Sequence, residues 1–126
     1  MSYLDEALKD LSECPEEARE FGLAEPTAIA MSNAEKVLRE MYRLWPIFHD
    51  VHMGPDDGEV ALQVSGGKGY LLVILCGPQG EILCIPVEDG KSKRKKYNIE
   101  SMDDLFAYLP QMLAVLKLNL VKSNSS

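Results

Sequence analysis

The feature that most constrains this chain is a pair of neighbouring segments that are apolar on both faces. Residues 70–76 are apolar at every position, and residues 82–87 are apolar again after a Gly-Pro-Gln-Gly turn at 77–80. Successive side chains of a strand point to opposite faces, so a sheet covered on one side only should alternate apolar and polar residues. Both faces of this hairpin therefore need cover.

Two arrangements would supply that cover. One long helix could pack on each face, or the helices could share one face and leave the other to a second protein chain. We favour the second arrangement, because helices that flank an antiparallel sheet in sequence commonly pack together on one face. An exposed apolar patch of a few hundred Å² usually marks an interface.

Periodicity and turn residues predict an α+β fold with N-terminal helices, an antiparallel meander of four to five strands and a C-terminal helix. The helix from 27 to 45 has an apolar stripe from Ile29 to Trp45 and ends before Pro46. Pro110 either kinks the last helix or restarts it. The expected elements are helices at 4–11, 15–21 and 27–45, strands at 47–53, 59–64, 70–76 and 82–87, an edge strand within 93–99, and a helix from Ser101.

The length of 126 residues suits a single domain. We expect residues 1–24 to form a loosely docked helical arm and residues 121–126 to form a frayed tail. The start of the chain has no signal-peptide pattern, no segment is apolar enough to span a membrane, and the three cysteines are too scattered for a disulfide framework. These features predict a cytoplasmic protein.

Charge is distributed unevenly along the chain. The first 90 residues carry 17 acids and 6 bases, whereas the last 36 carry 3 acids and 7 bases. A net charge of -7 disfavours general nucleic-acid binding, because such binding depends on neutralising phosphates. The basic run from Lys91 to Lys96 has three interpretations. It could contact phosphates, it could bind an acidic partner or the chain's own acidic N-terminal arm, or it could be a solvated edge strand.

No motif indicates catalysis, a cofactor or a metal. His49 and His52 would point to opposite faces of a strand and could not share a metal ion. A two-residue loop would place Cys76 and Cys84 on opposite faces, and a three-residue loop would place them on one face, displaced along the strands. We interpret both as small buried apolar residues. The turn Ser65–Gly69 lacks the spacing of a phosphate-binding loop.

Three segments resemble a family of small uncharacterised bacterial α+β proteins. They are the helix start Ala24-Glu25-Pro26-Thr27 with the following helix, the Asp-Gly turn before the strand at 59–62, and the strand-Pro-x-Gly-strand hairpin at 73–82. The Trp-Asp-Gly stretch associated with that family is replaced here by Arg19–Gly22. The resemblance covers roughly residues 20–88 and implies an α+β meander and a bacterial source, with no activity to transfer.

The sequence thus favours a non-enzymatic protein-binding module of the antitoxin, immunity or inhibitor kind. Its partner would be a protein, either a basic one or a second copy in a homodimer. Alternatives are an acidic secretion chaperone, a small enzyme using His49, Asp50 or His52, and a nucleic-acid-associated regulator. The expected partner-binding residues are Leu71, Val73, Leu75, Leu83, Ile85, Lys93, Arg94, Lys95 and Lys96.

Overall fold

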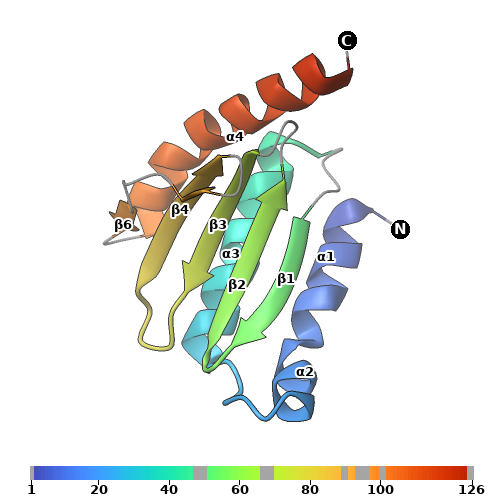
Figure 1. Cartoon of the computed structure of the whole chain (residues 1–126). Helices are drawn as coiled ribbons and strands as arrows, with labels where there is room; N and C mark the ends of the chain where they lie inside the picture. Colours follow the sequence, from blue (N-terminus) through green and yellow to red (C-terminus); the bar gives the residue numbers. More distant parts are fainter. Residues whose placement is uncertain are drawn as a thin grey trace.

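The computed structural model describes residues 2–46, 51–65, 70–88, 91–92, 97–99 and 102–124. Three N-terminal helices precede an antiparallel sheet, and a long helix follows it (Figure 1), so the predicted α+β class is confirmed. The elements are α1 (Tyr3–Ser12), α2 (Cys14–Glu20), α3 (Ala28–Leu44), β1 (Val51–Asp56), β2 (Glu59–Ser65), β3 (Tyr70–Cys76), β4 (Ile82–Glu88), β5 (Lys91–Ser92), β6 (Tyr97–Ile99) and α4 (Met102–Asn124).

Helix α3 forms where the apolar stripe predicted it. Thr27 caps its N-terminus by accepting a hydrogen bond from the Ala30 N–H, and Trp45, the residue before Pro46, ends it. Its buried residues follow helical spacing: Ala30, Ala34, Val37, Leu38, Met41 and Tyr42. Ile29, which the stripe was expected to include, is 52% exposed, because it lies one position off the buried face.

The four long strands pair in the order β1-β2-β3-β4, and the short strands β5 and β6 both pair with β4. The predicted edge strand within 93–99 is therefore found as β6, with β5 just before it in the sequence. The meander contains one more strand than expected, because the edge segment supplies two short strands instead of one.

The first hairpin turn is tighter than predicted. The sequence placed a turn over 54–58, but β1 runs through Gly54 and Pro55, and Asp56 pairs with Glu59. Only Asp57 and Gly58 form the turn, both with positive φ, of 47° and 96°. Such two-residue turns match the twist of the strands they join. The strand predicted to begin at residue 47 begins at Val51 within the described residues, and 47–50 lie outside them.

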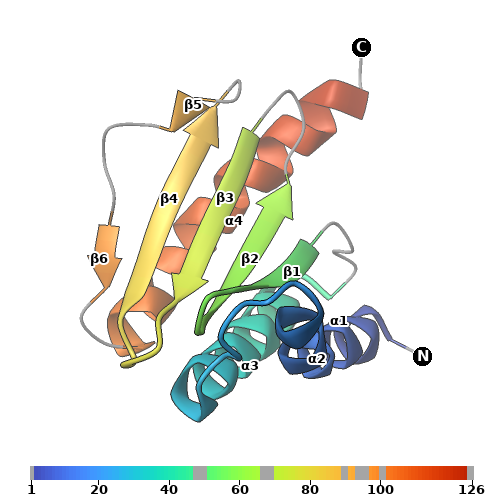
Figure 2. The same ribbon diagram turned by 60° about the horizontal axis from the view of Figure 1, so that its bottom comes forward.

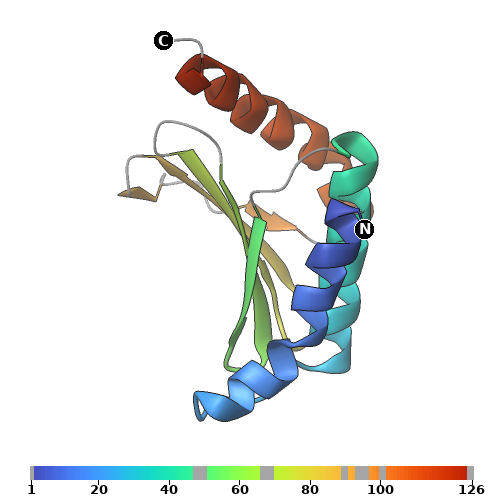
Figure 3. The ribbon, with the colours of Figure 1, turned by 90° about the vertical axis from the view of Figure 1, so that its right-hand side faces the viewer.

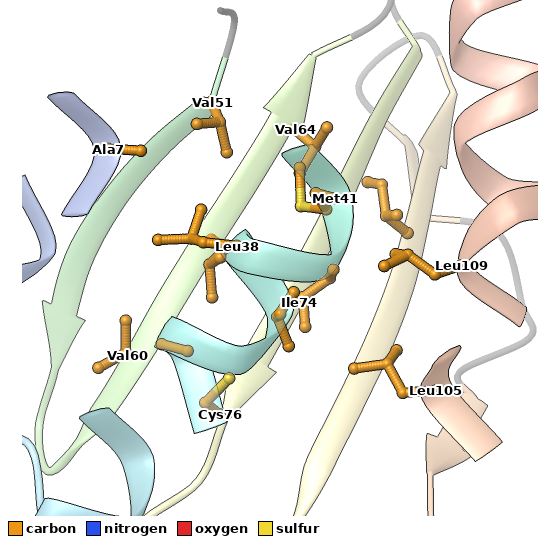
Figure 4. Packing of buried hydrophobic residues seen from close by; sticks show 14 of the residues in the cluster. Ala7, Leu38, Met41, Val51, Val60, Val64, Ile74, Cys76, Leu105 and Leu109 are labelled. Atoms are coloured by element: carbon orange, nitrogen blue, oxygen red, sulfur yellow. The ribbon is translucent and has the colours of Figure 1, made fainter. Parts of the chain in front are cut away.

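Helices α1 and α3 pack on one face of the sheet, and α2 lies at the end of β1. Seen edge-on, α1 and α3 lie on the same side of the sheet, and no described helix covers the long strands from the other side (Figure 3). Figure 4 shows Leu38 and Met41 of α3 over Val64 and Ile74, with Leu109 of α4 reaching the same core. The structure thus adopts the second of the two arrangements for the helices.

Both ends of the described chain are helical. The N-terminal arm buries Ala7, Leu11, Cys14 and Ala18, and its first three belong to the main core cluster. At the other end, α4 is one helix that continues through Pro110, so residues 121–124, expected to belong to the tail, remain helical. Its C-terminal half extends past the end of the sheet (Figures 1 and 3).

Three turns far apart in sequence are tied together at one end of the molecule. The Thr27 hydroxyl donates to the Pro78 carbonyl at 2.9 Å, and the Thr27 N–H donates to the Gly58 carbonyl at 3.2 Å. The Gly58 N–H in turn donates to the Ala24 carbonyl at 3.0 Å. The start of α3 is therefore fixed to both hairpin turns, which sets its position over the sheet.

Candidate functional site

The candidate site is the face of the sheet opposite the helices, which we call the outer face. Strand alternation places every second residue of β3 and β4 there, and the view in Figure 2 shows the four long strands side by side. On this face β3 and β4 carry six apolar side chains that are each partly buried, which we call the outer apolar patch: Leu71, Val73, Leu75, Leu83, Ile85 and Val87.

Register aligns the patch into rows that cross the sheet. Val73 is paired with Ile85, and Leu75 with Leu83. On the other side of β3, Val73 is paired with Gln63. The patch therefore covers β3 and β4 and becomes polar over β2.

The outer face is hollowed over β1 and β2. An open depression of about 410 Å³ lies there. Gly54 and Ala61 are paired across the two strands and give it a low floor, since neither carries a large side chain. The remaining lining residues are His52, Met53, Pro55, Asp56 and Gln63.

Three carboxylates lie at one end of the outer face. Asp56 is paired with Glu59, and Glu81 precedes β4 on the same face by alternation. We call Asp56, Glu59 and Glu81 the acidic row. Partial burial, together with the carboxylates of Asp56, Glu81 and Asp57, raises the pKa of Glu59 above its usual value.

Gly77 makes room for this row. It is buried in the turn between β3 and β4, and its N–H donates to the Glu81 carbonyl at 2.7 Å. A Cβ at Gly77 would overlap the Glu81 carboxylate. Glycine here therefore lets the Glu81 side chain lie back over the turn, toward Glu59.

The structure brings together only part of the predicted site. Leu71, Val73, Leu75, Leu83 and Ile85 lie on one surface, as expected. The other predicted residues, Lys93, Arg94, Lys95 and Lys96, lie outside the described residues.

Sequence reasoning missed Val87 and the acidic row. Val87 follows Leu83 and Ile85 at the same alternation, so strand parity alone could have added it. With strands expected at 47–53 and 59–64, Asp56 lay in the expected turn, and nothing in the sequence indicated that it faces Glu59. Only the register shows that these acids border the apolar patch.

The histidines and cysteines form no catalytic group among the described residues. His49 and Asp50 lie outside the described part, and His52 is exposed on the outer face of β1. Cys76 pairs with Ile82 and Cys84 with Ile74, so both thiols lie on the helix-covered face. Of the two arrangements predicted for Cys76 and Cys84, the structure has the one in which both side chains lie on the same face of the sheet.

Burial makes all three thiols poor nucleophiles. It is the main cause that raises the pKa of Cys76 to about 12 and that of Cys84 to about 11. Cys14 also has a pKa raised to about 11, by burial and by the neighbouring carboxylates of Glu17, Asp10 and Glu13. Thiols protonated at neutral pH act as small apolar core residues.

A second depression lies in the helix layer. It has a volume of about 220 Å³ and is lined by Leu44, Trp45, Pro110, Leu113 and Ala114, between the end of α3 and the middle of α4. The lining is mostly apolar, and the depression does not adjoin the outer face.

The described residues contain no group of three or more His, Cys, Asp or Glu side chains arranged to hold a metal ion. Among the same residues, no helix is long and apolar enough to cross a membrane. No family model, curated protein or solved structure matches this chain.

Proposed function

We propose that this protein is a non-catalytic binding module that docks another protein on its outer face, in the manner of antitoxin, immunity or inhibitor proteins. One observation carries the proposal: the helices cover one face of the sheet, while the opposite face of β3 and β4 carries six apolar side chains. Leaving such a patch in water forgoes about 25 cal/mol for each Å² that a partner could cover.

The burial and protonation of the three cysteine thiols support a binding role over a catalytic one. The thiols are protonated and lie on the helix-covered face, away from the outer face. The groups that border the outer apolar patch are carboxylates spread along a row, which suits electrostatic recognition of a partner. We place the protein in the cytoplasm in this proposal, as the sequence predicts.

Site-specific photo-crosslinking in the native host tests the proposal. A benzophenone side chain at Leu75, on the outer face, should crosslink a defined partner, whereas the same group at exposed Ser32 on α3 should not. The double substitution Val73→Asp and Leu83→Asp should abolish that crosslink. The matched control, Ala28→Asp with Ser32→Asp on the exposed surface of α3, adds the same two negative charges and should preserve it.

Thermal unfolding of both double variants shows whether they are folded. A crosslink from Ser32 equal to that from Leu75, or a partner retained by the folded outer-face variant, would contradict the proposal. Identification of the captured chain then separates an antitoxin-like inhibitor from an acidic secretion chaperone.

Homodimerisation is a second candidate use of the outer face. Two sheets can pack face to face with interdigitated apolar side chains, and this patch presents ordered rows for such packing. Sedimentation equilibrium over a range of concentrations tests it, with the Val73→Asp, Leu83→Asp variant as the monomeric reference.

A further inference from the structure

The outer face combines two features that call for different chemistry in a ligand. The outer apolar patch covers β3 and β4, and the acidic row crosses the end of the sheet where β1 meets β2 and β3 meets β4. Resting on the proposed function, we propose that the docked element is a cationic amphipathic segment of another protein. Its apolar side chains cover the patch, and its Lys or Arg side chains lie over the acidic row.

The charge of the acidic row is not compensated by the described residues. The ion pairs among them join Arg19 to Glu25, Arg39 to Glu35 and Arg43 to Glu40, and none reaches the row. Glu81 accepts one weak hydrogen bond, from the Gln79 N–H at 3.4 Å. Three carboxylates beside an apolar surface give a negative potential that a cationic partner would neutralise.

The spacing of the row suits a chain of cations better than a single ion. Asp56 is on β1 and Glu81 precedes β4, so three strand spacings separate them, about 14 Å at about 4.8 Å per strand. The described residues accordingly offer no cluster suited to a metal. Long, flexible Lys and Arg side chains along a peptide could reach carboxylates spaced in this way.

The hollow over β1 and β2 gives such side chains a place to lie. Its floor is Gly54 and Ala61, and Asp56 of the acidic row is part of its lining. The aliphatic stem of a Lys or Arg could cross this low floor while its charged end meets Asp56.

A second copy fits the outer face less well. Two copies packed face to face on this surface would bring their two acidic rows into one interface. Each copy also carries a net charge of -7 and the same acidic row. A cationic segment instead matches the charge of the face.

A pair of synthetic peptides tests the proposal with the full-length protein. In one peptide, lysines at one end are followed by alternating leucine and serine; in the other, glutamates replace the lysines. Binding is measured by titration calorimetry at low salt, and the contact surface is mapped by amide chemical-shift changes. We expect the lysine peptide to bind and to shift β3, β4 and the residues around Asp56 and Glu59.

Two triple variants with equal changes in net charge separate local recognition from overall charge. One variant removes the acidic row through three substitutions, Asp56→Asn, Glu59→Gln and Glu81→Gln. The other variant, Glu6→Gln, Asp10→Asn, Glu13→Gln, removes two exposed acids of α1 and the exposed acid that follows this helix, in the helix layer. Rim charges of this kind each contribute up to about 1 kcal/mol, so the first variant should bind the lysine peptide about tenfold more weakly and the second less than about twofold.

Each other outcome overturns the cationic assignment. Equal weakening by both triple variants would show a response to net charge alone, and equal binding of the glutamate peptide, or no binding of either peptide, would remove the role of the row. A dimer that excludes the peptide would assign the face to a second copy. The proposed function is judged separately by the Leu75 crosslink, which does not depend on the charge of the peptides.

Discussion

At the scale of a single residue, the charged form of Glu59 on the outer face lowers the free energy of unfolding. It lies on the same face as Asp56 and close to Glu81, and the pKa of its carboxyl is raised by partial burial and by these neighbours with Asp57. A raised pKa in the folded state means that the protonated form favours folding. That contribution is lost as the pH rises from acid to neutral.

We therefore expect Glu59→Gln to stabilise the protein at pH 7. The gain should be less than about 1 kcal/mol, since the carboxylate is mostly solvated, and it should shrink as the pH falls toward 4 and the wild-type carboxyl becomes protonated. Urea unfolding of both proteins at several pH values measures it. A destabilised variant at pH 7 would show that Glu59 has a favourable partner.

The cysteines lead to a second expectation for individual residues. Thiol reagents attack the thiolate, and raised pKa values of about 11 to 12 keep Cys14, Cys76 and Cys84 protonated at pH 8. We expect the native protein to react with a thiol reagent far more slowly than the unfolded protein, in which all three thiols should react. Intact-mass spectrometry follows the labelling, and one rapidly modified cysteine in the native protein would contradict its burial.

At the scale of elements, β3 has two apolar faces with different roles. Ile74 is fully buried under the helices, whereas its neighbour Leu75 is partly exposed on the outer face. A buried side chain leaves a cavity when truncated, but at a partly exposed position water can enter the space that the truncation leaves.

We expect Ile74→Ala to cost about 2–5 kcal/mol of unfolding free energy and Leu75→Ala less than about 1 kcal/mol. Urea denaturation gives both values in one host protein. Similar costs at the two positions would mean that the outer face is covered within the monomer.

The start of α3 provides a second expectation at this scale. The Thr27 hydroxyl both caps the helix and donates to the Pro78 carbonyl in the β3–β4 turn. Thr27→Val keeps the shape but loses both hydrogen bonds, so it should cost about 1–2 kcal/mol. Thr27→Ser retains the hydroxyl and should cost clearly less in the same unfolding measurement. Equal costs would show that the methyl group, not the hydroxyl, holds the helix start.

At the scale of the whole molecule, the two candidate partners respond to salt in opposite directions. Two copies, each with a net charge of -7, repel each other, and salt screens that repulsion. A cationic segment is attracted to the acidic row, and salt screens that attraction.

We therefore expect added salt to strengthen any self-association and to weaken binding of the lysine peptide. Sedimentation equilibrium and peptide titration at about 0.05 and about 0.5 M salt measure the two effects, since the Debye length falls several-fold over this range. Peptide binding that is insensitive to salt would show that apolar contacts alone hold the segment.

The sequence by itself determined the elements of this protein, because helices and strands follow from local periodicity, capping residues and turns. It identified α3 to within a residue, the β3–β4 hairpin, and five residues of the outer apolar patch. Whether one or both faces of the hairpin were covered by helices depended on long-range packing, and sequence could only weigh the alternatives.

The tertiary structure decided the register and the convergence of distant segments. One residue of difference in a loop reverses the face of every later side chain, so the placement of Cys84 and of the acidic row required the actual turns at 57–58 and 77–81. Three segments that are remote in the sequence meet at one end through Thr27, Gly58 and Pro78. Local propensity contains no information about such contacts, since they form between residues that are remote along the chain.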